Sequence, residues 1–257
     1  GFGATSHLSP VQSAGVSGAA SIGVGHYTMA AIKADGLTWW SWIGGETPDV
    51  MPAVGKLAGF ASGTSHNLVL LSDRTLLAYG SNDSGQLGDG TTTSRYSPVA
   101  VSGLSDVIAL AAGDGHALAL DAGGNVWVWG SNSSGQLGQG GSPGSSIPLE
   151  IPALTGVVQV SAGIDHSLAL DNAGSVWAWG SNSVGQLGDG TQTSRSTPVK
   201  LSALANVQAV TAGNSFSLAL KTDGSVWAWG TNYNGRLGSA TSYLETLPVQ
   251  VSGLSDV

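Results

Sequence analysis

The chain repeats one pattern at a fixed spacing, and this constrains its fold more than any other feature. Copies of a segment that reads VWAWGSNSVGQLGDGT at residues 176–191 begin at residues 76, 126, 176 and 226, so the period is 50 residues. The neighbouring segments, such as SAGIDHSLAL before it and TPVKL after it, recur in the same phase. A period of about 20–50 residues is typical of repeat architectures, in which each unit packs on its neighbours. We therefore expect an array of similar units.

Glycine and the scarcity of charge fit such an array. The chain has 40 Gly in 257 residues, well above the usual share of about 7%, and the glycines recur in the repeated segments, which indicates turns rather than disorder. Charged residues make up only 9%, against about 25% in typical proteins. Ser, Thr, Asn and Gly must therefore supply most of the polar surface.

The charge balance excludes several classes of partner and site. The net charge is −8 with only 8 Lys and Arg, so the chain has few cations to place against the phosphates of a nucleic acid or an anionic membrane. It has no Cys, which excludes disulfides, zinc–thiolate sites and thiol nucleophiles. No apolar run is long enough to span a bilayer as a helix.

The first residues, GFGATS, include neither a Met nor a signal segment, so we expect a processed piece of a longer protein. The low charge and the absence of Cys favour a secreted or surface-attached bacterial product. The cytoplasm is the alternative.

Each unit contains four short β signals. In the third regular copy of the pattern, the unit from 161, these are VVQVSAG, HSLAL, SVWAWG and TPVKL. Alternation along residues 175–179 places Trp177 and Trp179 on one face of a sheet and Val176 and Ala178 on the other. Turns such as DNAG and KTDG carry the residues that tolerate positive φ. Four-stranded units of this kind predict a β-propeller.

In a propeller each blade is covered on both faces, so its central strands must be apolar on both sides. Large indoles on one face then require small residues on the other, because protein interiors are close-packed. We expect a structural role in the core for six tryptophans: Trp127, Trp129, Trp177, Trp179, Trp227 and Trp229.

The repeat resembles that of the regulator-of-chromosome-condensation propellers, as a bacterial-type member. The family's motif is approximately A-G-x-x-H-S-L-A-L, D-G-x-V-W-x-W-G-x-N-x-x-G-Q-L-G and P-V, and residues 161–199 match it almost throughout. The resemblance covers nearly the whole chain. It implies a ring of four-stranded blades, seven in the best-known members.

The resemblance implies less about function. The family's eukaryotic founder is a nucleotide-exchange factor for a small GTPase and binds chromatin, through an inserted wedge and basic segments that this sequence lacks. A similar bacterial propeller inhibits β-lactamases by presenting one ring face to the enzyme. That mode requires only surface loops and stays open here.

The repeated histidines do not point to a metal site. His66, His116 and His166 occupy one repeat position, which we also assign to His26, and the fifth copy has Phe216. Equivalent positions on successive blades do not converge as zinc ligands must. We expect buried histidines bonded to the backbone.

Acidic residues give no stronger signal of catalysis. The loop that holds Asp83 and Asp89 lacks the spacing and closing Glu of an EF-hand, and GQLG does not open a helix as a phosphate loop does. A glycosidase needs two carboxyl groups about 5–10 Å apart, and the repeated acids lie on different blades. We therefore expect a protein that is not an enzyme and has no cofactor or metal, with glycosidase activity as a minor alternative.

Departures from the repeat indicate candidate binding residues. The first unit is shorter and carries an additional aromatic residue where other units have Val or Leu. Loop tips elsewhere carry Tyr and Arg, which are common at interface hot spots. The candidate partner-binding residues are Trp39, Arg95, Tyr96, Tyr233, Arg236 and Tyr243.

Two hypotheses of function follow. The first is a non-catalytic propeller that binds a partner protein through loops on one face. The alternative is a glycan-binding propeller with one site per blade, suggested by repeated asparagines near aromatic residues; a guanine-nucleotide exchange factor is a weaker alternative. The asparagines are Asn82, Asn132, Asn182 and Asn232.

We predict one repeat domain over residues 1–257. The final SGLSDV repeats residues 102–107, where another blade begins, so we expect five blades that form part of a seven-bladed ring. Open blade edges would then allow self-association. The predicted parts are 1–20 as an outer strand, 21–60 as a short blade, 61–110, 111–160, 161–210 and 211–251 as regular blades, and 252–257 as the start of a further blade.

Overall fold

The computed structural model is almost entirely β, which confirms the predicted class. Its strands form five antiparallel sheets of four strands each. The structure describes residues 19–24, 28–33, 39–43, 49–50, 55–141, 143–238, 242–254 and 257, with side chains from residue 55 onward.

Each sheet is a simple meander of four strands in chain order. The inner strands are β1 (Ala19–Val24), β5 (Leu57–Ser62), β9 (Val107–Ala112), β13 (Val157–Ala162) and β17 (Val207–Ala212). The second strands are β2 (Thr28–Lys33), β6 (His66–Leu71), β10 (His116–Asp121), β14 (His166–Asp171) and β18 (Phe216–Lys221). The third strands are β3 (Trp39–Ile43), β7 (Leu76–Gly80), β11 (Val126–Gly130), β15 (Val176–Gly180) and β19 (Val226–Thr231). The outer strands are β4 (Asp49–Val50), β8 (Arg95–Ala100), β12 (Ser145–Glu150), β16 (Arg195–Lys200) and β20 (Leu244–Gln250).

We call these sheets blades 1 to 5 in chain order. The regular blades begin at Leu57, Val107, Val157 and Val207, where inner-strand pairing starts. The predicted unit boundaries at 61, 111, 161 and 211 therefore fall inside inner strands, because the repeated glycine motif begins four residues after the pairing of each inner strand starts.

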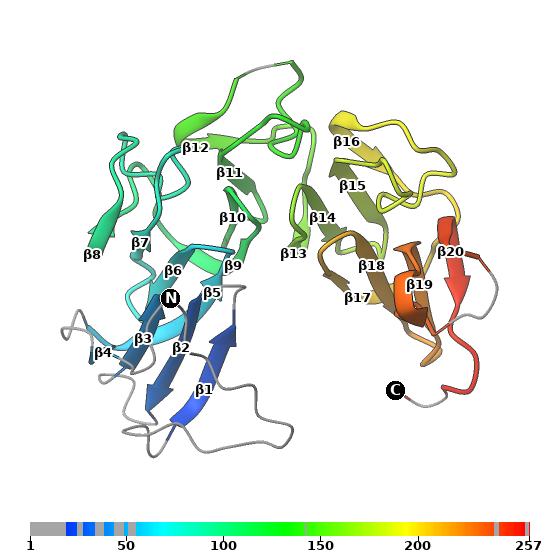
Figure 1. Cartoon of the computed structure of the whole chain (residues 1–257), viewed down its shortest axis with the longest axis horizontal. Coiled ribbons are helices and arrows are strands. Elements are labelled where there is room, and N and C mark those ends of the chain that lie inside the picture. The colour runs from blue at the N-terminus through cyan, green and yellow to red at the C-terminus, as the bar shows by residue number, and fades with distance from the viewer. Residues whose placement is uncertain are drawn as a thin grey trace.

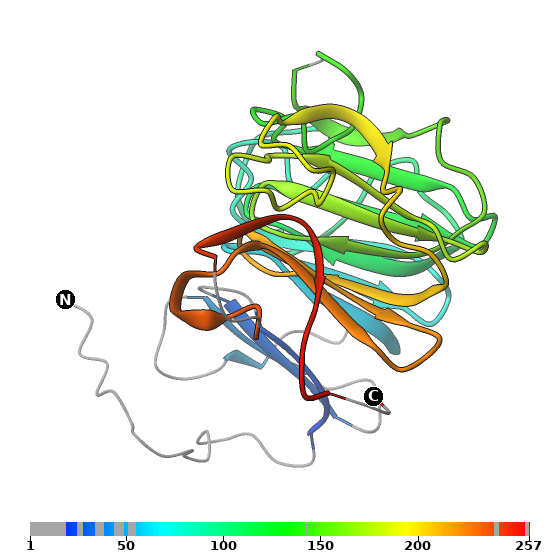
Figure 2. The ribbon, with the colours of Figure 1, turned by 90° about the vertical axis from the view of Figure 1, so that its right-hand side faces the viewer.

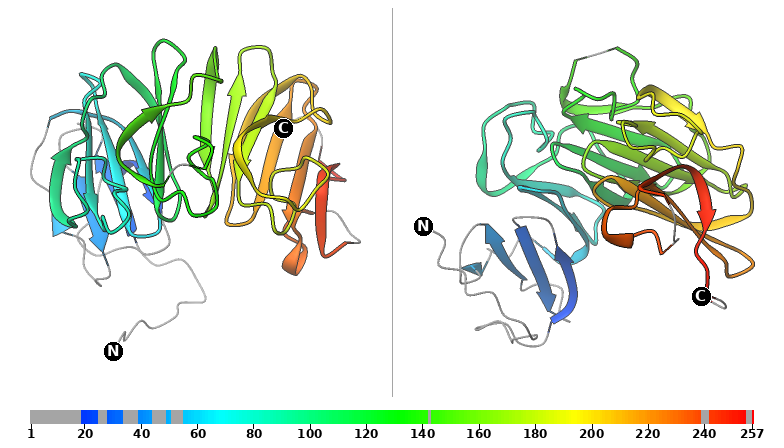
Figure 3. Two further views of the ribbon diagram at one scale, coloured as in Figure 1. Left: turned by 90° about the horizontal axis from the view of Figure 1, so that it is seen from above. Right: turned by 45° about the vertical axis from the view of Figure 1, so that its right-hand side comes forward.

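The blades follow one another around an open arc (Figure 1), with inner strands of consecutive blades in contact along its inside. Neighbouring blades are stacked face to face along the arc (Figure 3). The described chain is therefore not a closed five-bladed ring. That it is part of a seven-bladed ring stays a prediction.

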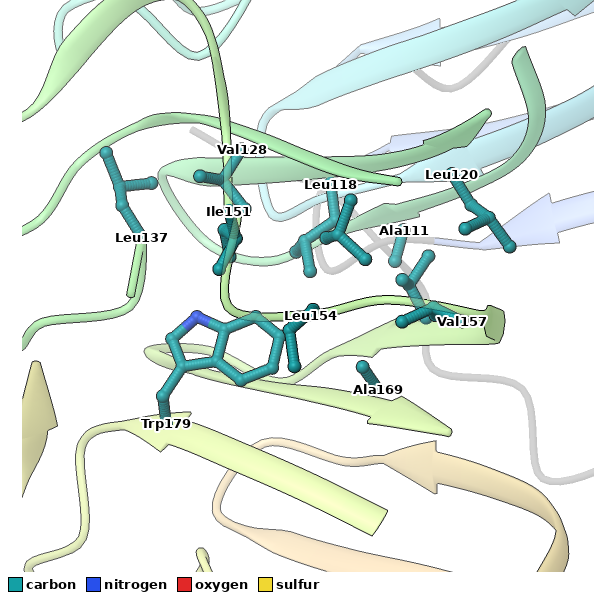
Figure 4. Packing of buried hydrophobic residues seen from close by; sticks show 12 residues of the cluster. Ala111, Leu118, Leu120, Val128, Leu137, Ile151, Leu154, Val157, Ala169 and Trp179 are labelled. Carbon is teal, nitrogen blue, oxygen red and sulfur yellow. The ribbon is translucent and has the colours of Figure 1, made fainter. Parts of the chain in front are cut away.

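The second tryptophan of each W-x-W pair fills the contact between blades. Trp129, Trp179 and Trp229 are fully buried. Figure 4 shows Trp179 of blade 4 lying against Ile151 and Leu154, near the face of blade 3 that carries Leu118. Removing about 150–250 Å² of such a side chain from water contributes at most about 4–6 kcal/mol.

The first tryptophan of each pair behaves differently from the prediction. Trp127, Trp177 and Trp227 are only half-buried. They lie near the hairpin between the second and third strands, where the indole Nε1 of Trp177 donates to Asp171 Oδ2 at 3.1 Å. These indoles therefore stabilise the hairpin as well as the core.

The loop with the GQLG sequence reaches from one blade over the next. In blade 3, Gly140 N donates to Ser196 O of β16 at 2.8 Å. Gly138 has a φ of +68°, and a Cβ there would lie 3.0 Å from two atoms of Trp179. Glycine thus allows both the turn and the close approach of the next blade's indole.

Within the described chain, helical structure is limited to the 3-10 turn η1 (Tyr233–Gly235). None of the described segments could therefore cross a membrane as a helix.

Candidate functional site

The repeated histidines are buried at the start of the second strands. His66, His116 and His166 have no exposed surface. Room for each ring comes from a glycine three residues earlier: a Cβ on Gly163 would collide with His166 Cε1. The motif G-x-x-H is therefore a packing motif, and the ring of Phe216 fits over Gly213 in the same way.

The imidazoles of His116 and His166 are each bonded to the next blade. His166 Nε2 lies 3.0 Å from Ser217 Oγ, and this hydroxyl donates to Gln186 O at 2.8 Å. Trp229 Nε1 donates to the same carbonyl at 2.9 Å. Because the hydroxyl gives its one proton to Gln186, His166 must donate through Nε2–H.

We call this arrangement the junction relay, and the junction between blades 3 and 4 has it too. There His116 Nε2 lies 3.0 Å from Ser167 Oγ. Gln136 O accepts from Ser167 Oγ at 2.9 Å and from Trp179 Nε1 at 2.8 Å. The predicted burial of these histidines is correct, but the expected backbone partner is wrong. The partner is a serine 51 residues away, which the sequence of one unit does not reveal.

The junction between blades 2 and 3 lacks part of the relay. Trp129 Nε1 donates to Gln86 O at 2.9 Å, but Ala117 stands where the later blades have serine. Neither ring nitrogen of His66 has a hydrogen-bond partner within the described chain. Asn67, which follows it, accepts from Ser62 Oγ at 2.8 Å.

Burial lowers the pKa of all three histidines. It brings the pKa of His66 and of His166 to about 4, and that of His116 to about 3, where the two neighbouring imidazoles also disfavour a charge. The rings are therefore neutral near pH 7. They act as neutral hydrogen-bonding and packing groups.

In the first sheet, Thr28 pairs with Ile43, at the position where the regular blades pair His or Phe with Gly. The register thus assigns Thr28 to the repeat position that we gave to His26. His26 itself lies outside the described residues.

The repeated asparagines hold their own loops. Asn182 is fully buried, and its Oδ1 accepts from Leu187 N at 2.9 Å. Its Nδ2 donates to Asp189 Oδ1 and Thr191 O, both at 3.0 Å. Asn82 repeats these bonds, and Leu137 N and Leu237 N donate to Asn132 and Asn232. These amides are engaged within the loops, so they do not support the glycan alternative that they suggested.

Arg95, one of the candidate binding residues, is bound to the same kind of loop. Its Nε and Nη2 donate to Asp89 Oδ2 at 3.0 and 2.9 Å. Burial raises the pKa of Asp89, but bonds from Thr91 and Arg95 outweigh it and leave that pKa below its ordinary value. Arg195 and Asp189 form the equivalent pair. Across the described residues, no three His, Asp or Glu side chains are gathered as metal ligands.

Three other candidates, Tyr233, Arg236 and Tyr243, lie together with Phe216 on blade 5. We call these four residues the blade-5 patch. The guanidinium carbon of Arg236 lies 5.9 Å from the ring centroid of Phe216 and 5.8 Å from that of Tyr233. Arg236 Nε donates to Tyr233 O at 2.9 Å. The rings of Tyr233 and Tyr243 meet edge to face at 6.1 Å.

The two remaining candidates lie elsewhere. Tyr96 is 86% exposed near the start of β8 in blade 2. Trp39 begins β3 opposite Ile32, at the end of its strand away from the long loops. Neither belongs to the blade-5 patch.

A family model for the RCC1-like domain matches residues 44–257. This chain belongs to the RCC1-like domain family. The resemblance inferred from its repeats is therefore confirmed. No curated protein matches the chain closely enough to serve as a relative.

Solved structures give the same fold for this RCC1-like domain. Prp20p from Saccharomyces cerevisiae matches with a TM-score of 0.80 and 20% identity, over 91% of this chain and 63% of Prp20p. Human WBSCR16 matches with a TM-score of 0.79 and 22% identity, over 90% and 67% of the two chains. The ectodomain of the Physcomitrella patens receptor kinase CR4 matches with a TM-score of 0.55 and 19% identity, over 82% and 50%. This RCC1-like domain thus spans less than two thirds of Prp20p, and these identities establish the fold alone.

Loops between inner and second strands line a hollow of about 370 Å³ in this RCC1-like domain. Asp114 is its only charged lining residue among those described. Half-burial and the nearby charge of Asp114 raise the pKa of Asp165, which also accepts from Gln136 Nε2 at 3.2 Å. The two acids stand at different positions of adjacent loops, so the repeat gave no signal that they interact.

Proposed function

We propose that this RCC1-like domain is a non-catalytic module that binds a partner protein through the loops at one end of its blades. One observation carries the proposal. The buried histidines and asparagines hold the blades and loops together, whereas the side chains of Tyr233 and Tyr243 are exposed on a loop.

The shape of this end fits a protein better than a small molecule. The described parts of the long loops, 81–94, 131–141, 181–194 and 232–238, lie at the same end of the sheets as the loops around the hollow. The hollow is lined mainly by Gly, Ala and Ser, which offer few groups to orient a ligand. A protein interface uses about 800 Å² per partner, which suits a row of loops better than a single hollow.

The related structures support protein binding as a use of this fold. One study of Prp20p concerns its binding to Gsp1p and histones, and another presents Kap60 bound to it. For this chain the partner remains part of the proposal. The same surface would serve at a cell surface, as the composition predicts, or in the cytoplasm.

Site-specific photo-crosslinking in a lysate of the source organism tests the proposal. Crosslinkers at Ser133 and Ser183, exposed on the long loops, should capture one protein partner. Matched crosslinkers at Ala122 and Thr222, exposed on the hairpins at the opposite end, should not. Capture from the hairpins alone, or hydrolysis of a glycan panel without any captured protein, would contradict the proposal.

A further inference from the structure

The long loop of a regular blade binds one residue at the start of the next outer strand. In blade 3, Gly140 N donates to Ser196 O at 2.8 Å, and a Cβ on Gly135 would lie 2.8 Å from Ser196 Cα. Two loop glycines thus hold one strand residue, by a hydrogen bond and by close contact. Figure 2 shows β16, the strand of Ser196, in yellow on the outer side of the arc. The same contacts join Gly85 and Gly90 to Ser146, and Gly185 and Gly190 to Thr246.

Blade 2 has the equivalent strand position, but the blade before it has no such loop. The position is Tyr96 in β8, which lies on the outer side of the arc in Figure 1. Residues 81–94 join the third and outer strands of blade 2, whereas only residues 44–48 join those of blade 1, without a GQLG sequence. No loop N–H within the described chain is bonded to Tyr96 O. The loop is thus missing between two blades that the chain contains.

The uncovered residue is of a different kind from the covered ones. Ser196 and its equivalents in blades 3 and 5 are small, where a loop glycine packs against the Cα. Tyr96 is 86% exposed, so nearly all of its ring is left to contact a partner, and aromatic rings are common anchors of protein interfaces. Its neighbour Arg95 is paired with Asp89. Binding here therefore depends on the ring and the backbone rather than on charge.

We propose that the start of β8 at Tyr96 is a docking site for a glycine-containing loop of a partner protein. The loop binds as the chain's own loops bind blades 3 to 5. One glycine N–H donates to Tyr96 O, and a second glycine, which has no side chain, lies against the tyrosine ring. This contact uses an outer strand beside the loops of the proposed function and does not depend on them.

The three filled positions define the sequence of the segment bound. Each is filled by two glycines in the spacing G-x-x-x-x-G. All six glycines have φ between +76° and +83°, a conformation that other residues rarely adopt. The partner's loop therefore needs glycine at both positions.

Disulfide-closed random peptides displayed on phage are the probe, selected on the immobilised chain, which has no Cys to exchange with them. Enriched peptides should carry the G-x-x-x-x-G spacing, and Tyr96→Ser should weaken their binding about tenfold or more. Tyr243→Thr removes another exposed tyrosine and should leave the binding unchanged. Each variant takes the residue of a regular blade, so both should fold, and thermal unfolding checks this.

A gain of affinity tests the geometry of the site. Leu247 is the equivalent of Ser97 in blade 5, and a Cβ on Gly190 would lie 3.4 Å from Leu247 Cδ2. Ser97 is exposed, so Ser97→Leu adds an apolar contact for the partner's glycine without disturbing the core. It should tighten the binding of the selected peptides about three- to tenfold.

Several outcomes would overturn the inference. These are no enrichment, enriched peptides without the glycine pair, equal binding to Tyr96→Ser, and no gain on Ser97→Leu. An oligosaccharide whose binding depends on Tyr96 would also overturn it. If any of these occurs while crosslinkers at Ser133 and Ser183 still capture a protein, the proposed function stands without this site.

Discussion

His166 and Ser217 lie on adjacent blades and are joined by a hydrogen bond of 3.0 Å from imidazole Nε2 to hydroxyl Oγ. The same bond links His116 to Ser167, whereas His66 faces a blade with Ala117 in place of the serine. The chain thus contains complete and incomplete versions of one junction, which allows direct comparison.

Removing the hydroxyl should weaken the junction of blades 4 and 5. Ser217→Ala leaves the buried Nε2–H of His166 without an acceptor, so the free energy of unfolding should fall by about 1–3 kcal/mol. Urea denaturation with an unchanged m-value measures this. Ser183→Ala, at an exposed loop position, is the control and should change it by less than about 0.5 kcal/mol. An equal effect of both variants would contradict a role for the relay.

Adding the missing hydroxyl should strengthen the junction of blades 2 and 3. Ala117→Ser gives His66 Nε2 an acceptor and gives Gln86 O a donor, so stability should rise by about 0.5–1.5 kcal/mol. Ala119→Ser, two residues along the same buried strand, gains no such partner and should destabilise by about 1–3 kcal/mol. Similar losses from both variants, measured by denaturation, would show that the site cannot accept the relay.

Stability should fall as the pH is lowered below about 6.5. The pKa values of the buried histidines are about 3 to 4 in the folded chain and near 6.5 when unfolded, so between these values the unfolded state binds more protons. Each histidine then contributes a slope of up to about 1.4 kcal/mol per pH unit. Unfolding free energies measured from pH 7 to pH 4.5 test this.

Replacing one histidine should reduce that pH dependence. His66→Phe places at blade 2 the residue that blade 5 carries at 216 and removes one titrating group. Between pH 6 and pH 5, the slope of the unfolding free energy against pH should therefore fall by the contribution of one histidine, up to about 1.4 kcal/mol per pH unit. An unchanged slope would assign the pH dependence to other groups, such as the carboxylates.

Two glycines with the same backbone conformation should respond differently to a methyl group. Gly138 and Gly103 have φ of +68° and +70°, but only a Cβ on Gly138 meets other atoms, those of Trp179, within 4 Å. Gly103→Ala should cost about 1 kcal/mol for the left-handed backbone. Gly138→Ala should cost about 1–3 kcal/mol more, because the indole of the next blade must shift. Thermal and urea unfolding compare the two directly.

The sequence alone determined the class of fold and the role of its strongest pattern. The period of 50 residues, the alternation around Trp177 and Trp179 and the turns with Gly and Asp are local, and each restricts the backbone or the face of a strand. Because the same local pattern recurs in every unit, the four-stranded blades and the burial of Trp129, Trp179 and Trp229 followed without any knowledge of contacts.

Only the tertiary structure decided which side chains meet. A repeat identifies equivalent positions, but a contact between blades joins positions that are not equivalent, such as His166 and Ser217 at a separation of 51 residues. For the same reason the sequence grouped Arg95 with Arg236 as loop-tip arginines. In the folded chain a carboxylate neutralises Arg95, whereas aromatic rings from a distant strand and from the same loop hold Arg236. Packing, which depends on distance in space rather than along the chain, therefore gives the two arginines different neighbours.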